Sequence, residues 1–196
     1  MKKPFFQLLF CSALLCALPL AAMADDISPG QATPGAGSDS VQVSKMDIPG
    51  IYNFSRTEGG TGFGGATEPT ALPELHSMGY RTVINLRLAD EDGVDVAASR
   101  EAARQAGLSY IHLPFDSANP DPDFFTEFLA AVDAEGNQPV YIHCGSATRV
   151  AALWMTRRVI EEGWDMQTAS EEASPISGQP EAAVSYATGY IEKQRE

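Results

Sequence analysis

The sequence predicts an α/β fold with a central, mostly parallel sheet of four to five strands flanked by helices. Two observations support this prediction. From residue 46 onward, short apolar runs alternate with amphipathic stretches of helical periodicity. Glycines and polar turn residues separate these runs. Strands that alternate with helices along a chain form parallel sheets with helices on both faces.

The first half of the predicted domain contains five segments. Ile51–Phe54 is expected to be a weak strand, and Gly59–Gly65 a glycine-rich loop. Thr70 is a suitable cap for a short helix that ends near Gly79. The β-branched run Thr82–Leu86 predicts a strong strand, and the amphipathic run Val96–Ala106 a helix that ends before a glycine.

The second half continues the alternation. Tyr110–Leu113 predicts a strand, and the aromatic face of Pro122–Val132 predicts a helix. Pro139–His143 is the next expected strand, followed by a helix over Val150–Ile160. A last helix is expected from about Glu181 to Lys193.

The N-terminal residues 1–24 predict a cleavable secretory signal. Two lysines precede the apolar stretch Phe5–Leu20, and Ala22-Met23-Ala24 forms a small-x-small cleavage site. We therefore expect cleavage after Ala24 and a periplasmic or secreted product without a stable membrane anchor. The alternative is an uncleaved N-terminal anchor.

The remaining chain divides into two parts by composition. Residues 25–45 are rich in Gly, Ser, Pro, Ala and Gln, and this composition predicts a flexible leader. Residues 46–196 have the size of one domain.

Charge and cysteine content limit the possible functions. The net charge of −13 excludes the electrostatic footprint that nucleic-acid binding requires. Cleavage of the signal removes Cys11 and Cys16 and leaves Cys144 as the single cysteine. A lone cysteine in an oxidising compartment indicates a reactive thiol, an intermolecular bond or a buried structural residue.

The segment from Val140 to Arg149 favours the reactive thiol. A β-type run ends at Cys144, a loop of small residues follows, and Arg149 lies at the start of a predicted helix. Backbone N–H groups of such a loop and of a helix N-terminus favour an anion and lower the pKa of a nearby thiol. The guanidinium can hold two oxygens of that anion. The expected anion-binding residues are Gly145, Ser146, Ala147, Thr148 and Arg149.

The run His143-Cys144-Gly145-Ser146-Ala147-Thr148-Arg149 resembles the catalytic loop of the Cys-phosphatase superfamily. Four residues between Cys and Arg are similar to the bacterial dual-specificity-phosphatase-like branch, the beta-lactamase-hydrolase-like family. The strand segment Thr82–Arg87 also resembles that family, and the likeness covers roughly residues 46–193. It implies a Cys-phosphatase-like fold.

The resemblance further implies a phosphatase that acts on phosphomonoesters, among them phosphotyrosine in a protein or a small phosphorylated molecule. Cys144 would attack phosphorus and form a phosphocysteine, while Arg149 and the loop amides hold the oxygens. No metal or other cofactor is implied. His143 and Arg87 are expected to support the site, although Arg87 could instead pair with Asp90 or Glu91.

The general acid is expected on the loop that follows the strand 110–113. The resemblance implies Asp116 for this role, with Asp121 and Asp123 as alternatives. Asp121 is also a suitable cap for the helix that begins at Pro122.

Three residues depart from the family pattern. Gly145 stands where the branch has arginine, Ala147 where it has glycine, and Val150 where a hydroxyl residue is usual, although Ser146 or Thr148 could supply that hydroxyl. A catalytically dead, anion-binding pseudophosphatase is therefore an alternative function. A rhodanese-like sulfurtransferase is another, because a Cys, four residues and a basic residue also resemble that active-site loop.

Overall fold

The computed structural model describes residues 42–194. The predicted signal and most of the predicted leader lie outside these residues. The strands are β1 (Val43–Lys45), β2 (Ser55–Thr57), β3 (Gly62–Gly64), β4 (Thr82–Asn85), β5 (Ser109–His112) and β6 (Val140–His143). The helices are α1 (Leu72–Ser77), α2 (Val96–Ala106), α3 (Phe124–Asp133), α4 (Thr148–Ile160), α5 (Met166–Ile176) and α6 (Pro180–Gln194), with short 3₁₀ turns at Pro69–Ala71 and Glu135–Asn137.

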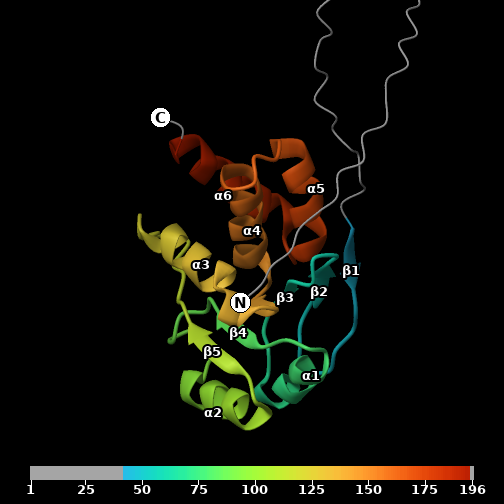
Figure 1. Ribbon diagram of the computed structural model, residues 1–196. Helices are drawn as coiled ribbons and strands as arrows, with labels where there is room; N and C mark the ends of the chain where they lie inside the picture. Colours follow the sequence, from blue (N-terminus) through green and yellow to red (C-terminus); the bar gives the residue numbers. More distant parts are fainter. Residues whose placement is uncertain (1–41, 195–196) are drawn as a thin grey trace, which may run out of the picture. The chain divides into compact units, whose positions relative to one another are not determined.

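The strands form one sheet in the order β1-β2-β3-β6-β4-β5 (Figure 1). The four strands β3, β6, β4 and β5 pair in parallel, whereas β1 and β2 add an antiparallel edge. The predicted α/β class and mostly parallel sheet are therefore confirmed. The described part of the chain contains six strands rather than four to five.

The additional strands correct three expectations. β1 lies inside the segment 25–45 that we expected to be a flexible leader, β2 begins after Ile51–Phe54 rather than within it, and β3 lies in the expected glycine loop. Glycine at β3 is required by packing, because a Cβ at Gly62 would overlap the Tyr80 ring and one at Gly64 the Tyr141 hydroxyl. Glycine content therefore marks close packing here, not a loop.

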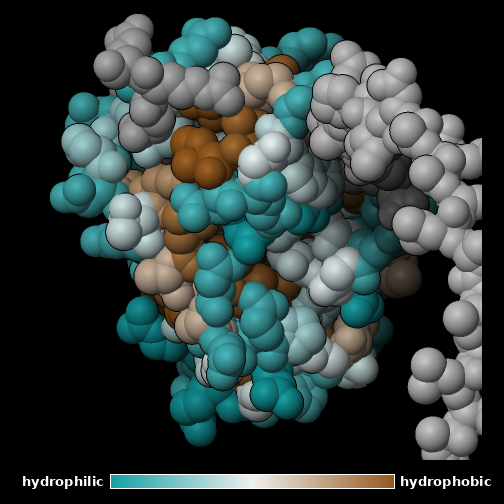
Figure 2. Space-filling view, turned by 45° about the horizontal axis from the view of Figure 1, so that its top comes forward, coloured by the Kyte–Doolittle hydropathy of each residue, from teal (hydrophilic) through white to brown (hydrophobic). Residues whose placement is uncertain are grey.

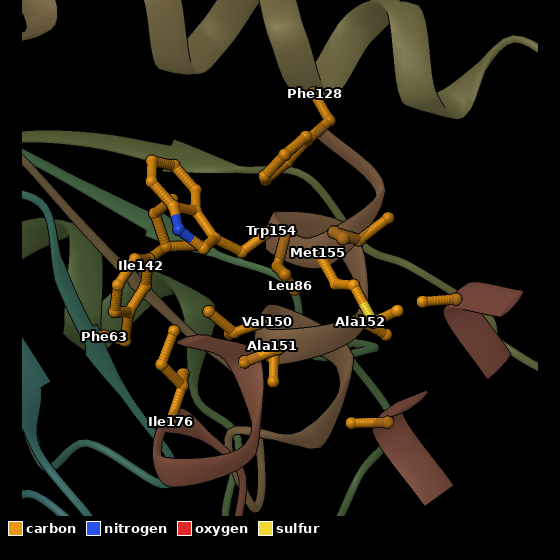
Figure 3. Packing of buried hydrophobic residues seen from close by; sticks show 14 of the residues in the cluster. Phe63, Leu86, Phe128, Ile142, Val150, Ala151, Ala152, Trp154, Met155 and Ile176 are labelled. Carbon is orange, nitrogen blue, oxygen red and sulfur yellow. The ribbon is translucent and has the colours of Figure 1, made fainter. Parts of the chain in front are cut away.

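Each face of the sheet carries its own hydrophobic core, as strand alternation requires. Val83 and Tyr141 pack with α1 and α2 on one face. Ile84 and Ile142 pack on the other face with α3, α4, α5 and α6. Figure 3 shows Trp154 of α4 beside Phe63, whose ring centroids are 5.0 Å apart.

The helices agree with the sequence to different degrees. α2 has the predicted bounds, with the Asp95 side chain capping its start and Gly107 in the left-handed conformation at its end. The chain before α1 forms a 3₁₀ turn, so Thr70 lies inside that turn and is not the helix cap. α5 was not predicted, because its polar composition and Pro175 are atypical of a helix. This helix packs on α4 and α6.

The molecular surface is mixed in character. Figure 2 shows hydrophobic side chains gathered in a band between hydrophilic residues on the face that it presents. Within residues 42–194, no helix combines the length and the hydropathy that a membrane span requires.

Candidate active site

Cys144 directly follows β6, a central strand of the sheet, and so lies at the carboxyl ends of the parallel strands. Ligands bind at these ends in α/β folds. The Cys144 N–H donates to the Gly64 carbonyl (3.2 Å), and the carbonyl of His143 accepts from the Leu86 N–H (2.8 Å). Neighbouring strands on both sides therefore fix the end of β6. The Cys144 side chain is free of disulfide bonding and buried, with 1% of the residue exposed.

The loop after Cys144 has its amides turned inward. The Gly145 carbonyl accepts from the Ala66 N–H (2.7 Å), and the Ser146 carbonyl accepts from the Gly178 N–H (2.9 Å). Both acceptors therefore point outward from the loop. In a trans peptide the N–H lies opposite the carbonyl, so the N–H groups of Ser146 and Ala147 face the inside of the loop. This arrangement can bind an oxyanion.

The first turn of α4 adds to the anion site. Its helix begins at Thr148, and the unpaired N–H groups of a helix N-terminus attract negative charge. Ala147, immediately before it, has φ 63° and ψ 3°, in the left-handed region. The loop therefore imposes on an alanine a backbone conformation that glycine adopts without strain.

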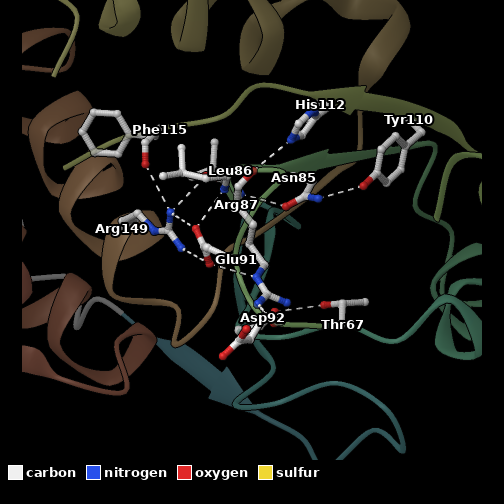
Figure 4. A network of polar contacts seen from close by, with 12 residues as sticks. Thr67, Asn85, Leu86, Arg87, Glu91, Asp92, Tyr110, His112, Phe115 and Arg149 are labelled. Carbon is white, nitrogen blue, oxygen red and sulfur yellow. Dashed lines mark hydrogen bonds and ion pairs between the residues drawn. The ribbon is translucent and has the colours of Figure 1, made fainter. Parts of the chain in front are cut away.

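Arg149 projects from α4 and is held by Glu91 (Figure 4). Its Nη1 and Nη2 donate to the two carboxylate oxygens of Glu91 at 2.6 and 2.9 Å, and Nη1 also donates to the Phe115 carbonyl at 3.2 Å. These bonds occupy one edge of the guanidinium. A guanidinium has five N–H donors, so the opposite edge, Nε and the second Nη2 hydrogen, remains for an anion.

The charges of this pair reinforce one another. Burial alone raises the pKa of Glu91, but hydrogen bonds from Arg149, the Leu88 N–H and Arg87 lower it to about 2. Burial alone lowers the pKa of Arg149, but Glu91 and the neighbouring Cys144 raise it. Both groups therefore stay charged at neutral pH.

Glu91 is the candidate site residue that the sequence analysis missed. It was considered only as one of two acids that could pair with Arg87. The structure shows that pairing, with Arg87 Nε 3.1 Å from Glu91 Oε2, and places Glu91 between Arg87 and Arg149. Arg87 also donates to the Asp92 carbonyl at 2.6 Å. The Arg87 side chain therefore holds Glu91 and bonds to protein partners, and its supporting role in the site remains a prediction.

His143 is buried beside the nucleophile, with 5% of the residue exposed. Its ring stacks on Tyr141, with centroids 5.8 Å apart, and its Nδ1 lacks a hydrogen-bond partner within the described residues. Burial, with smaller contributions from the charges of Arg87 and Arg149, lowers the pKa of His143 to about 4. The ring is therefore neutral at pH 7 and adds no positive charge next to Cys144.

The three candidate acids lie on the loop between β5 and α3. Asp116 follows Phe115, whose carbonyl contacts Arg149, so its backbone borders the site. Its carboxylate accepts from the Ala118 N–H at 2.9 Å. Asp121 accepts from the Asp123 N–H at 2.9 Å, a local turn contact just before α3. Only Asp116 adjoins a residue that contacts Arg149, and Asp123 lies directly before α3.

The hydroxyl groups of the loop bond to each other. Ser146 Oγ and Thr148 Oγ1 are 2.8 Å apart, and the Ser177 hydroxyl donates to Thr148 Oγ1 at 3.2 Å. Val150 is fully buried. Ser146 and Thr148 border a cavity of about 350 Å³ whose lining also includes Arg149, Phe115 and Tyr186.

No cluster of three or more His, Cys, Asp and Glu side chains with a geometry for metal binding occurs between residues 42 and 194. Hydroxyls and one guanidinium line the cavity, and Cys144 interacts with that guanidinium. Together with the loop amides, these groups form a candidate anion-binding site with a nucleophile.

Comparison with known proteins confirms the predicted Cys-phosphatase-like fold. The family model for the phosphatase-like domain of beta-lactamase hydrolase-like proteins matches residues 65–160, which include Glu91, Asp116, Cys144 and Arg149. Residues 65–160 are therefore similar in sequence to that phosphatase-like domain. No curated protein sequence matches the chain.

Solved structures share the fold. The structure of TpbA from P. aeruginosa has a TM-score of 0.62 and 21% identity, with 79% of this chain and 91% of that chain covered. A cysteine-to-serine variant of TpbA, solved in complex with pTyr, gives a TM-score of 0.61 and 20% identity and covers 79% of this chain and 90% of that chain. The core catalytic domain of the PP-IP phosphatase SIW14 from S. cerevisiae has a TM-score of 0.60 and 15% sequence identity. The match covers 76% of this chain and 96% of that chain.

Proposed function

We propose that this protein is a Cys-dependent phosphatase that hydrolyses phosphomonoesters, including phosphotyrosine, through a phosphocysteine intermediate. The observation that carries the proposal is the loop whose inward amides, helix N-terminus and free guanidinium edge surround Cys144. Such a cradle favours the phosphoryl oxygens of a bound substrate.

The first step transfers the phosphoryl group to sulfur. The Cys144 thiolate attacks phosphorus, and an S–P bond forms as the P–O bond to the leaving group breaks. Asp116 donates a proton to the leaving oxygen. Arg149 and the amides of residues 145–149 hold the equatorial oxygens, whose charge is spread in the transition state.

The second step returns the enzyme to its starting state. The Asp116 carboxylate accepts a proton from water as the water oxygen attacks phosphorus and the S–P bond breaks. Inorganic phosphate leaves, and the Cys144 thiolate is regenerated. No redox partner or metal enters this sequence.

Hydrolysis of para-nitrophenyl phosphate under reducing conditions tests this proposal. We expect activity in the wild type, none in Cys144→Ser, and a reduction of about 10²–10⁴-fold in Asp116→Asn, the range for a general acid. Asp121→Asn is the matched control, because asparagine keeps the turn contact to the Asp123 N–H. A loss in Asp121→Asn with full activity in Asp116→Asn would reassign the acid.

A non-catalytic anion-binding role is the second candidate. It is favoured by the buried Val150 and by the loop hydroxyls, which bond to one another. Orthovanadate or phosphate binding by a wild type that does not hydrolyse aryl phosphates would support this role. Cys144-dependent formation of thiocyanate from thiosulfate would instead indicate a sulfurtransferase.

The proposed location is the periplasm, on the basis of the signal predicted over residues 1–24. Fractionation of cells that express the full chain tests it. We expect the protein in the periplasmic fraction with its N-terminus at Asp25, and recovery of the uncleaved chain in the membrane would contradict cleavage.

A further inference from the structure

We propose that the groove along α6 binds the polypeptide that flanks the phosphorylated residue, so that the substrate is a phosphotyrosyl protein segment. This inference rests on the proposed phosphatase function and extends it. Two neighbouring cavities carry the argument, one of about 350 Å³ at the anion site and one of about 410 Å³ farther along α6.

Tyr186 lines both cavities and joins them. In the first cavity it lies with Arg149 and Phe115, and its ring meets that of Phe115 edge-on at 5.7 Å. In the second it lies with Tyr190 and Lys193. A chain that places its phosphoryl group at Arg149 can therefore continue past Tyr186 into the second cavity.

One stripe of α6 forms a wall common to both cavities. Ala182, Tyr186, Gly189 and Lys193 recur at spacings of three and four residues, which places them on one helix face. The opposite face of α6 is buried in the core through Ala183, Ala187 and Ile191. The groove is therefore fixed to a rigid element.

The loop that carries the candidate acid forms the other wall. Phe115 and Ser117 line the first cavity, and Pro120 and Pro122 line the second. A peptide in the groove would lie between this loop and α6, next to Asp116. Occupation of the groove would thus hold the acid-bearing loop beside the reacting phosphate.

The length of the stripe suits an extended peptide. Ala182 and Lys193 are eleven positions apart on α6, a distance of about 16 Å at 1.5 Å per residue. An extended chain covers this distance with about five residues at 3.3 Å each. The groove therefore has room for the phosphorylated residue and about four residues on one side of it.

The chemistry of the groove favours a peptide over a polyphosphate. Prolines and tyrosines make up half of the residues that line its second cavity, and Asp121 and Lys193 are the charged residues of that lining. A ligand with several phosphates needs several cations close together, and the lining of the two cavities offers Arg149 and Lys193 at opposite ends. Burial, together with the neighbouring Tyr190 and Asp116, raises the pKa of Tyr186 to about 12, so its hydroxyl remains a donor at neutral pH.

Gly189→Gln tests the groove without disturbing the core. A Cβ at Gly189 meets no atom within 4 Å, so a glutamine side chain fits there and extends into the second cavity. Gly136→Gln is the matched control, since Gly136 is equally open and lies in the 3₁₀ turn Glu135–Asn137. Substrates are para-nitrophenyl phosphate, N-acetyl-phosphotyrosine amide, and two hexapeptides with phosphotyrosine at one or the other end and apolar flanking residues.

We expect one hexapeptide to exceed the capped amino acid at least tenfold in kcat/KM. Gly189→Gln should lower the ratio of hexapeptide to para-nitrophenyl phosphate kcat/KM at least fivefold, and Gly136→Gln should leave it unchanged. Equal rates for hexapeptides and capped amino acid, or an unchanged ratio in Gly189→Gln, would overturn the proposal.

Binding separates this inference from the phosphatase proposal. Fluorescence anisotropy of the same labelled hexapeptides with Cys144→Ser, alone and combined with Gly189→Gln, needs no turnover. Tight binding that Gly189→Gln weakens at least fivefold supports the groove even if the wild type hydrolyses nothing. Binding that is absent, or that is the same in both variants, overturns it.

Discussion

Replacing Glu91 by glutamine tests whether this residue positions Arg149 for an oxyanion. Glutamine has nearly the same shape, but it is neutral and offers one acceptor oxygen instead of two. It therefore cannot accept from both Nη1 and Nη2, which lie 2.6 and 2.9 Å from the carboxylate oxygens. Arg149 should then be held less firmly, because Nη1 keeps its contacts to the Leu86 and Phe115 carbonyls but Nη2 loses its acceptor.

The size of the effect follows from the two lost bonds. A hydrogen bond to a charged group contributes about 1.5–3 kcal/mol. The side chains of Arg149 and Glu91 are 17% and 25% exposed, so water replaces part of this interaction. We therefore expect a net loss of about 1.5–3 kcal/mol of transition-state stabilisation, or roughly a 10- to 100-fold fall in kcat/KM.

The assay is para-nitrophenyl phosphate hydrolysis by Glu91→Gln, with kcat and KM measured separately. The fall should lie mainly in kcat, because the guanidinium contacts are strongest in the transition state. Glu101→Gln is the matched control, since Glu101 also pairs with an arginine, Arg104, but on the exposed surface of α2. Activity of Glu91→Gln within twofold of wild type would refute the reasoning.

The pH dependence of folding gives a second readout of the same residue. The folded-state pKa of Glu91, about 2, lies below the ordinary value of 4.5. Its ionised form therefore stabilises the fold above pH 4.5, and this contribution disappears as the pH falls toward 2. The stability difference between wild type and Glu91→Gln in urea should be largest at pH 7 and should shrink at pH 3.

Three further substitutions test other parts of the structure. Glu172→Gln should lower the free energy of unfolding by about 1.5–3 kcal/mol in a urea titration, because it removes the bidentate acceptor of Arg158, which keeps only its bond to Glu162. A change under about 1 kcal/mol would contradict this. Ala147→Gly should raise the free energy of unfolding by about 0.5–1 kcal/mol, because glycine adopts the left-handed conformation at φ 63° without strain. A destabilised variant would show that Ala147 is not strained. The wild type should lose stability as the pH falls from about 6.5 to 4, because the unfolded histidine binds its proton at a higher pH than the buried His143. His143→Asn should remove this loss. An unchanged dependence of the free energy of unfolding on pH would argue against burial of a neutral ring.

The sequence predicted those parts of the fold that depend on local pattern. The bounds of α2 followed from an apolar stripe between Asp95 and Gly107, and β4 and β6 from β-branched and apolar runs. β3 was missed, because its glycines reflect the nearby Tyr80 and Tyr141 rings, which are distant in the sequence. α5 was missed for a related reason, since its stability comes from packing on α4 and α6.

In the candidate site, too, some relations follow from local sequence and others depend on contacts between distant segments. Cys144, the loop and Arg149 are consecutive, so their relation could be inferred from one segment. Glu91 is 58 residues away from Arg149 in the sequence, and only the parallel pairing of β4 with β6 brings its loop to the guanidinium. The groove along α6 depends likewise on how this helix packs beside the loop after β5, which no local pattern encodes.

The most direct test of the account is to trap the covalent intermediate. The wild type is mixed with para-nitrophenyl phosphate, quenched in acid within the first turnover, digested and examined by mass spectrometry. We predict one phosphoryl group on the peptide that contains Cys144, and none on the same peptide from Cys144→Ser. Hydrolysis that continues in Cys144→Ser, or that leaves Cys144 unmodified in the quenched wild type, would contradict the central claim.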